Sequence, residues 1–252
     1  MDIVHDGAGV RVQLCGTFAV ELAGRSHADD FASRQARLLF AFLVLNRPQP
    51  MPRDVLVDAL WGDAPPAAAA NALTVLISRL RTALGADLIR GRAELAIVLP
   101  EPAHVDVDRA VAALHRAESA VAARRWDRAW YASLAALFVS RRTLMPGADA
   151  EWLEGWRRRL ADVRLRALEC YAQTCLGIDH SELPAAQRSA RELVELAPLR
   201  ETGHLLLMRA LAAGGNEAEA LACYGRLRLI LAEELGTEPG PAVQRYYQQL
   251  LH

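Results

Sequence analysis

The sequence predicts an α+β N-terminal winged helix-turn-helix followed by an all-α, tetratricopeptide-like helical domain. Three observations lead to this fold class. The first hundred of the 252 residues mix short strand patterns with helical ones, and nearly every later segment is helical. Prolines 100 and 102 mark the change of pattern. A shift of 34 residues superimposes two of the later helices, and this is the tetratricopeptide period. We therefore expect one domain over residues 1–99 and a second over residues 105–252.

The first domain opens with a predicted β-hairpin and a helix. Apolar and polar residues alternate over residues 10–14 and 18–22, on either side of a turn at residues 15–17. Over residues 34–46, apolar residues recur every three or four positions, which is typical of a helix with one buried face. Ser33 stands where a helix N-cap is expected.

Two more helices and a closing hairpin complete the predicted first domain. A proline-rich loop over residues 47–52 precedes a short helix, and Pro52 suits the first turn of that helix. The next helix runs from about residue 67 to Leu84 and stops at Gly85. Strand patterns at residues 88–90 and 95–99 then flank a turn. This order is that of a winged helix-turn-helix, whose third helix enters a DNA major groove.

The third predicted helix has two different faces. At about 100° per residue, four aliphatic residues fall within about 60° of one another and form a buried stripe: Leu73, Ile77, Leu80 and Leu84. The opposite face carries side chains that can hydrogen-bond to base edges or touch a thymine methyl group: Asn71, Val75, Ser78, Arg79 and Thr82. Three further arginines are placed to contact phosphates, Arg81 at the flank of the helix and Arg90 and Arg92 on the hairpin.

Positive charge in this domain is local. Residues 1–99 contain ten arginines and ten acidic residues, whereas residues 71–92 contain four arginines and a single acidic residue, Asp87. A local patch predicts weaker and less salt-dependent non-specific DNA binding than that of a strongly basic protein. The same residues are also compatible with an ordinary solvated helix face.

Seven helices joined by short loops are predicted in the second half, from apolar residues at three- and four-residue spacing: residues 109–124, 126–140, 151–176, 183–196, 199–213, 217–234 and 241–251. The 34-residue shift places Ala186 on Ala220 and Leu193 on Leu227. Stacked helix pairs of this kind bury a continuous core and leave a surface that can hold another chain. A purely structural bundle is the alternative.

Composition and motifs argue against an enzyme and against a cofactor. The chain contains no lysine, so a Walker phosphate loop and Schiff-base chemistry lack their essential amine. The four cysteines form no C-x-x-C pair, and we expect small buried thiols rather than metal ligands or disulfides. Histidines 104, 115, 180 and 204 are scattered without a nucleophile at motif spacing. Acidic residues 101, 106 and 108 are interpreted as a solvated linker.

Nothing in the sequence predicts a membrane association. The longest uninterrupted apolar run, residues 38–45, is far shorter than the roughly 20 residues that cross a bilayer. Residues 1–7 have neither a cationic region nor an apolar region of the kind that directs export. We therefore expect a cytoplasmic protein.

Motifs in both halves carry a family resemblance. In the first half they are Leu-Val-Asp-Ala-Leu-Trp-Gly-Asp-Ala-Pro-Pro at residues 56–66, Asn-Ala-Leu at 71–73 and Ile-Ser-Arg-Leu-Arg-Thr-Ala-Leu-Gly at 77–85. In the second half they are Val-Asp-Val-Asp-Arg at residues 105–109, Glu-Trp at 151–152, and the segment 224–242 with its Leu-Gly-Thr-Glu-Pro-Gly-Pro. Over nearly its whole length, the chain resembles the antibiotic-regulatory-protein (SARP) family of bacterial transcriptional activators.

The resemblance implies an OmpR-type winged helix that reads direct repeats in double-stranded promoter DNA. It also implies that the helical half, a bacterial transcriptional activation domain, supports a homodimer on DNA and contacts RNA polymerase holoenzyme. Members of the family commonly switch on biosynthetic gene clusters. Arg34, at the start of the first helix, matches a basic position that faces phosphate, a role that helix N-termini suit on physical grounds as well.

Two departures from the family pattern support a different function. The wing has Gly91-Arg92-Ala93-Glu94 where a glycine pair and an aromatic residue are usual, and Thr82 stands where arginine is more common. Both changes lower the expected affinity for DNA. The alternative is therefore a scaffold protein, with a decayed winged helix and a helical domain that binds a partner protein.

Overall fold

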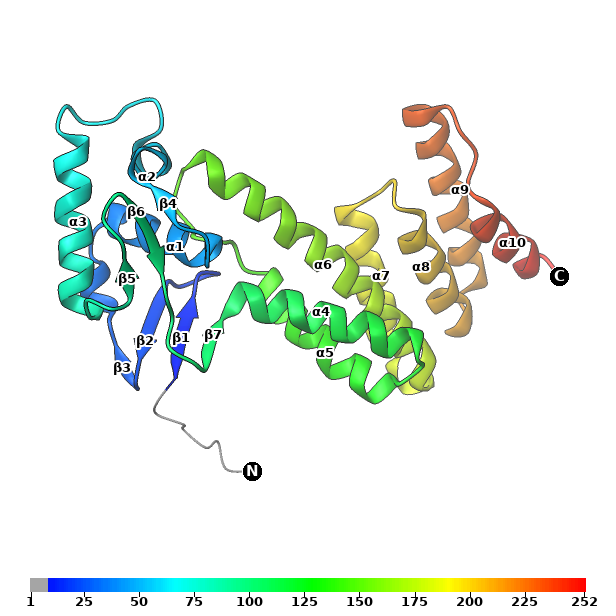
Figure 1. The fold of residues 1–252 in the computed structure, drawn as a ribbon. Helices are drawn as coiled ribbons and strands as arrows, with labels where there is room; N and C mark the ends of the chain where they lie inside the picture. The colour runs from blue at the N-terminus through cyan, green and yellow to red at the C-terminus, as the bar shows by residue number, and fades with distance from the viewer. Residues whose placement is uncertain (1–8) are drawn as a thin grey trace. The chain divides into compact units, whose positions relative to one another are not determined.

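The computed structural model describes residues 9–252, so the expectation about an export signal in residues 1–7 lies outside the described residues. The chain divides into two compact units. Figure 1 colours the chain by residue number, so the ranges of each unit can be found in it. The first ends at Arg109 and also contains Arg142–Leu160. The second consists of Ala110–Arg141 and Ala161–His252.

The first unit contains a four-stranded sheet. Its strands β1 (Val10–Gln13), β2 (Ala19–Leu22), β3 (Arg25–Ser26) and β7 (Ala103–Val105) lie in the order β3-β2-β1-β7. Strands β1 and β2 are antiparallel, which confirms the predicted first hairpin. Strand β7 pairs in parallel with β1 and places Val105 opposite Val12.

Strand β7 and the residue after it correct two interpretations of the sequence. Residues 100–104 are not simply a junction, because Ala103 and His104 belong to a strand of the first unit. Asp106 is not a solvated linker residue: its carboxylate accepts the backbone N–H groups of Leu14 at 2.9 Å and Cys15 at 2.8 Å. Burial raises the pKa of Asp106, and these backbone hydrogen bonds oppose the increase.

Three α-helices fill the first unit. Helix α1 (Arg34–Asn46) follows a short 3₁₀ helix, η1 (Ala28–Phe31), and begins as predicted, with the Ser33 hydroxyl accepting the N–H of Ala36 at 3.1 Å. Residues 38–45 of α1 are all buried, so this helix forms the centre of the core. Helices α2 (Arg53–Trp61) and α3 (Ala69–Leu84) pack against it.

A second small sheet forms the wing. Strands β4 (Met51–Pro52), β6 (Glu94–Ile97) and β5 (Ile89–Arg90) lie in the order β4-β6-β5. Pro52 is therefore a strand residue opposite Glu94 and lies just before α2, contrary to the prediction that it opens the helix. A proline is tolerated in this edge strand because an edge position leaves an N–H group unused.

A segment from the later half of the sequence completes the first unit. The N–H of Gly16 donates to the carbonyl of Thr143, and the N–H of Met145 donates to the carbonyl of Leu14. Trp152 donates its indole N–H to the carbonyl of Ala59 at 3.0 Å, and its ring meets that of Phe42 edge to face, with centroids 5.1 Å apart. The sequence did not predict this packing.

The second unit is helical, and all seven predicted helices are present: α4 (Asp106–Ala122), α5 (Trp126–Ser140), α6 (Glu151–Ile178), α7 (Leu183–Leu196), α8 (Glu201–Ala213), α9 (Glu217–Leu235) and α10 (Pro241–Leu250). The first part of α6 and the start of α4 belong to the first unit. A 3₁₀ turn, η2 (His180–Glu182), precedes α7. Ala186, Leu193, Ala220 and Leu227, which the 34-residue shift aligned, are all buried.

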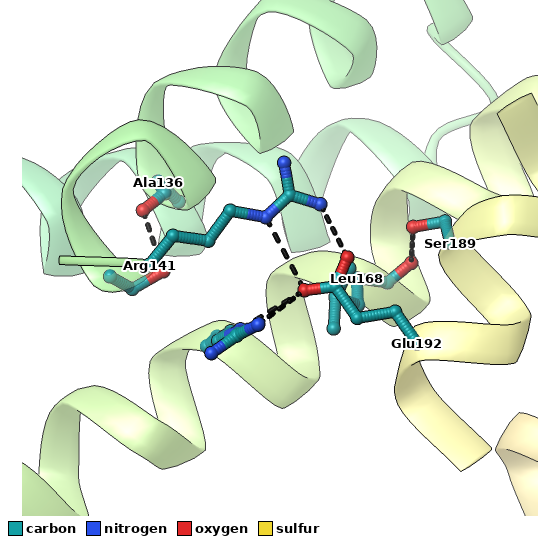
Figure 2. A network of polar contacts seen from close by, with 7 residues as sticks. Ala136, Arg141, Leu168, Ser189 and Glu192 are labelled. Carbon is teal, nitrogen blue, oxygen red and sulfur yellow. Dashed lines mark hydrogen bonds and ion pairs between the residues drawn. The ribbon is translucent and has the colours of Figure 1, made fainter. Parts of the chain in front are cut away.

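A charge network joins three helices of the second unit, as Figure 2 shows. Glu192 of α7 binds Arg141, which directly follows α5, at 2.6 Å and Arg164 of α6 at 2.7 Å. Burial raises the pKa of Glu192, but the hydrogen bonds and charges of the two arginines outweigh it and leave the pKa below its ordinary value. Ser189 of α7 adds a hydrogen bond to the carbonyl of Leu168.

The predicted burial of the cysteines is confirmed. Cys15, Cys170, Cys175 and Cys223 are all free and buried. In the part of the chain that the structure describes, none of the helices combines the length and the apolar character that crossing a membrane requires.

Candidate nucleic-acid interface

Helix α3 presents one buried face and one exposed face, as the angular argument predicted. Leu73, Ile77, Leu80 and Leu84 are buried against the rest of the first unit. The opposite face is open to solvent along the whole helix, and Val75 at its middle is 49% exposed. The exposed members of this face are Asn71, Val75, Ser78, Arg79 and Thr82. We call these five residues the α3 face.

Most polar groups of the α3 face are available to a ligand. Thr82 donates its hydroxyl proton to the carbonyl of Ser78 at 3.0 Å, which leaves the lone pairs of its oxygen as acceptors. Within residues 9–252, the side chains of Asn71, Ser78 and Arg79 make no hydrogen bond to the protein. Amide, hydroxyl and guanidinium groups are the donors and acceptors that read base edges in a major groove.

Arg81 ties the wing to α3. Its Nε donates to the carbonyl of Ile89 at 2.9 Å, and one terminal nitrogen donates to the carbonyl of Gly91 at 2.6 Å. Both acceptors lie in the β5–β6 hairpin, which Figure 1 shows beside α3. The sequence placed Arg81 at the flank of the helix to meet a phosphate. In the structure, two of its five donors hold the hairpin, and the phosphate contact stays a prediction.

Gly91 allows the hairpin to turn sharply. Its φ is +93°, and a Cβ atom at this position would lie 1.9 Å from the carbonyl oxygen of Glu94. Any other residue would force the turn open. The short turn leaves Arg90 and Arg92 exposed, and the Nε of Arg90 donates to the carbonyl of Asp87 at 3.2 Å.

Arg53 is a member of this surface that the sequence argument missed. Its guanidinium donates to the Thr74 hydroxyl of α3 and, at 3.3 Å, to the carbonyl of Arg92 in the wing. Together with Ser78, Arg81 and Thr82 it lines a groove of about 370 Å³. Its position in the first turn of α2, the helix before α3, was the available signal.

Arg34 lies at the start of α1. Its guanidinium donates to the carbonyl of Asp149, in the segment that completes the first unit. It lines a pocket of about 270 Å³ with Arg37 and residues 145–148, and no α3 residue lines this pocket. Ser33 and Ala36, which lie on either side of Arg34 in the sequence, line a further pocket of about 470 Å³ together with Ser78, Arg79 and Thr82 of the α3 face.

Histidines 104, 115 and 204 do not assemble into a reactive site. His104 and His115 are exposed, whereas His204 is buried and bonds to the carbonyl of Pro198 at 2.9 Å. Burial lowers the pKa of His204, which favours its neutral form. Residues 9–252 also contain no cluster of three or more histidine, cysteine or acidic side chains suited to a metal ion.

Two family models match the chain. The model described as transcriptional regulatory protein, C terminal, matches residues 31–97, and the bacterial transcriptional activator domain matches residues 105–251. The first match covers all three helices of the first unit and the wing. With the winged-helix fold, the two matches define a bacterial transcriptional regulator.

Known relatives identify the family to which this regulator belongs. The chain is 33% identical over 228 residues to regulatory protein AfsR of Streptomyces coelicolor and 28% identical over 238 residues to regulatory protein DnrI of Streptomyces peucetius, with 87% of this chain covered in each case. These matches span 22% of AfsR and 84% of DnrI. The chain belongs to the antibiotic-regulatory-protein family of transcriptional activators. Its relatives are transcriptional regulators and not enzymes.

A solved structure has the same fold. Mycobacterium tuberculosis EmbR, in complex with a low-affinity phosphopeptide, superimposes with a TM-score of 0.82 at 25% identity, over 96% of this chain and 65% of EmbR. The chain thus spans about two thirds of EmbR and about a fifth of AfsR.

Proposed function

We propose that this chain is a sequence-specific activator that binds direct repeats in promoter DNA through the α3 face. The observation that carries the proposal is the division of α3 into a fully buried stripe and an exposed polar face. In this proposal Asn71, Ser78 and Arg79 hydrogen-bond to base edges. Val75 and Thr82 complete the reading face, Val75 by contact with a thymine methyl group.

The backbone contacts of the proposal come from the wing and from neighbouring arginines. Arg90 and Arg92 are exposed on the hairpin and reach phosphates. Arg81 and Arg53 set the position of the wing beside α3, and their remaining donors face the same groove. Arg34, at the start of α1, contacts a phosphate beside the α3 face, because its neighbours Ser33 and Ala36 line a pocket with Ser78, Arg79 and Thr82.

The remaining parts of the proposed function belong to the helical half. We propose that it supports a homodimer on two DNA repeats and contacts RNA polymerase holoenzyme, in the cytoplasm. A biosynthetic gene cluster is the proposed target. Membership of the activator family and the match of the activator-domain model to residues 105–251 support these assignments.

A mobility-shift titration with the DNA upstream of the chain's own operon tests the proposal. Arg79→Ala should weaken binding by about 1–3 kcal/mol. The matched control is Arg116→Ala, because Arg116 is an exposed arginine on α4 in the second unit. A salt-sensitive shift that Arg79→Ala weakens and Arg116→Ala does not is the expected result.

The opposite result would support the scaffold alternative. If the chain gives no salt-sensitive shift with that DNA, or if Arg79→Ala binds like the wild type, the α3 face does not read DNA. The hairpin is formed and is bound by Arg81, which supports the activator proposal over a scaffold with a decayed wing.

A further inference from the structure

A pocket of about 270 Å³ lies in the first unit, and the proposed function uses only one of its residues, Arg34. Three stretches of the sequence line it: residues 16–18 between β1 and β2, Arg34 and Arg37 in α1, and residues 145–148. All three stretches belong to the first unit. The volume is slightly below the roughly 300–1,000 Å³ of pockets for drug-sized ligands, so it suits a smaller molecule. We call it the α1 pocket.

The charged side chains of the α1 pocket are both positive. Arg34 and Arg37 line it, and none of the described residues that line it is acidic. Arg34 donates through one nitrogen to the carbonyl of Asp149, which leaves other donors of its guanidinium unused. Arg37 is half-buried, and within residues 9–252 its guanidinium makes no hydrogen bond or ion pair. A partly buried cation without a partner favours an anion beside it.

The other walls of the α1 pocket are apolar. The ring of Phe18 meets that of Phe31 edge to face, with centroids 5.0 Å apart, which holds the Phe18 ring in place. Met145 is buried, and Pro146 lines the pocket next to it in the sequence. An apolar group placed against these walls is removed from water, which favours binding. The pocket therefore fits a molecule with an anionic head and an apolar body.

Arg157 of α6 fixes the loop that forms one of these walls. Its guanidinium donates to the carbonyls of Met145 at 3.3 Å and Ala148 at 2.8 Å. The N–H of Met145 donates to the carbonyl of Leu14 at 2.8 Å, which ties this loop to the stretch that carries Phe18. The walls are in place before a ligand arrives, so binding does not have to order them.

We propose that the α1 pocket binds a small organic carboxylate. Arg34 and Arg37 bind its two oxygens, and its apolar body lies against Phe18 and Met145. A guanidinium matches the planar geometry of a carboxylate, with two parallel hydrogen bonds. A free phosphate ion or a phosphate of DNA supplies the charge but leaves the apolar walls in water.

A bound carboxylate has a consequence for DNA binding. The proposed function assigns a DNA phosphate to Arg34, so an anion on the same guanidinium competes with this contact and repels the phosphate. The α1 pocket is then an effector site that lowers the affinity for DNA. This consequence rests on the proposed function, whereas binding of the carboxylate does not.

Titrations of the full chain with benzoate, benzamide and inorganic phosphate test the pocket. Benzoate has an anionic head and an apolar ring, benzamide is its neutral isostere, and phosphate lacks the ring. The readout is the NMR signal of isotope-labelled methionine methyl groups, because Met145 lines the pocket, whereas Met51 and Met208 do not. Benzoate should shift the Met145 signal in a saturable way and leave the other two in place. Benzamide and phosphate should bind at least about tenfold more weakly.

Arg37→Gln tests the role of the charge. The variant should stay folded, because the Arg37 guanidinium has no hydrogen-bond partner in the described chain, and circular dichroism checks this. Its affinity for benzoate should fall at least about tenfold. Arg25→Gln is the matched control and should bind benzoate like the wild type, since Arg25 is exposed on β3 of the same unit and does not line the pocket.

Four results would overturn the proposed pocket: no saturable shift of the Met145 signal with benzoate, equal binding of benzoate and benzamide, phosphate binding as tight as that of benzoate, or equal affinity of wild type and Arg37→Gln for benzoate. The first of these, together with a Met145 shift on addition of promoter DNA, would assign the pocket to the DNA interface instead.

Mobility shifts with and without benzoate, at constant ionic strength, test the consequence for DNA. Benzoate should lower the DNA affinity of the wild type and have a smaller effect on Arg37→Gln. A DNA affinity that benzoate leaves unchanged in the wild type would reject the effector role. Absence of any DNA binding would reject the proposed function, while the NMR titration still decides whether the pocket binds a carboxylate.

Discussion

Arg81 connects α3 to the wing, a contact that its position in the sequence did not indicate. It donates to two carbonyl groups of the hairpin, Ile89 and Gly91. An arginine used in this way sets where Arg90 and Arg92 lie relative to α3. We therefore expect its effect on DNA binding to act through the wing and to be independent of the base sequence.

Arg81→Ala should weaken binding to all DNA sequences alike. Loss of two hydrogen bonds to backbone carbonyls should also lower the free energy of unfolding by about 1–2 kcal/mol. Urea denaturation and mobility shifts on matched and unrelated DNA measure the two effects. Arg79→Ala is the comparison, since an exposed side chain without a protein partner should change affinity and leave stability unchanged. A sequence-selective loss in Arg81→Ala would show that it reads a base.

Asp106 and Cys15 show what residue types alone do not reveal. Acidic residues near two prolines indicated a solvated linker. In the structure, the Asp106 carboxylate accepts the two backbone N–H groups that directly follow β1. The pairing joins positions 91 and 92 residues apart, and no local pattern encodes such a contact. The burial of Cys15 was predicted, whereas the hydrogen bond from its backbone N–H to Asp106 was not.

At the scale of elements, local signals predicted the helices well. Helix α1 begins at the predicted residue because Ser33 caps it, and it also ends at the predicted Asn46. Helix α3 ends at Gly85, whose φ of +99° suits glycine. The two-residue strand β4 and the three-residue strand β7 were missed. Short strands are defined by their partners, and Met51 and Ala103 pair with residues far away in the sequence.

The network around Glu192 predicts a pH dependence of stability. The pKa of Glu192 is lower in the folded chain than its ordinary value of 4.5. The unfolded chain therefore binds more protons in the window just below 4.5, and the contribution of Glu192 is present above this pH and is lost as the pH falls through the folded pKa. Glu192→Gln should cost roughly 1 kcal/mol at pH 7, after allowance for partial exposure.

Chemical denaturation between pH 7 and pH 3 measures this contribution. The difference in unfolding free energy between wild type and Glu192→Gln should shrink as the pH falls below about 4.5. Glu195→Gln, on an exposed carboxylate of the same helix, is the control. A constant difference across this range would mean that the network does not hold Glu192 in its ionised form.

At the scale of the whole molecule, the first unit is assembled from two stretches of sequence. Residues 142–160 supply backbone hydrogen bonds to Leu14 and Gly16, and Trp152 covers Phe42 and Ala59. The activator-domain match at residues 105–251 includes this stretch. The change of composition near residue 100 thus marks a change of secondary structure, while the packing of the first unit continues beyond it.

A fragment that ends at Arg109 should be less stable than the first unit of the full chain. It lacks the packing of Trp152 on Phe42 and leaves this aromatic residue more exposed. We expect the fragment to unfold at a lower urea concentration. In the full chain, Trp152→Phe should lose about 1 kcal/mol, because a ring is kept but the hydrogen bond to Ala59 is removed. Equal stability of fragment and first unit would contradict this assembly.

The candidate interface was predictable to the extent that it lies on one helix. The periodicity of α3 fixes which side chains are buried, and the exposed set follows from that. The contacts of Arg81 and Arg53 with the wing depend on how the wing folds back against α3. Arg53 and its acceptor in Arg92 are 39 residues apart, so the sequence offered no period from which to infer the contact.

The central claim is that the α3 face reads base pairs, and a base-substitution scan tests it most directly. The affinity of the full chain and of Arg79→Ala is measured for the bound site and for every single base-pair change in it. We predict that the wild type loses about 1–3 kcal/mol at the base pair that Arg79 contacts, and that Arg79→Ala tolerates every base at that position while keeping its selectivity elsewhere. An identical selectivity profile for both proteins would contradict the claim.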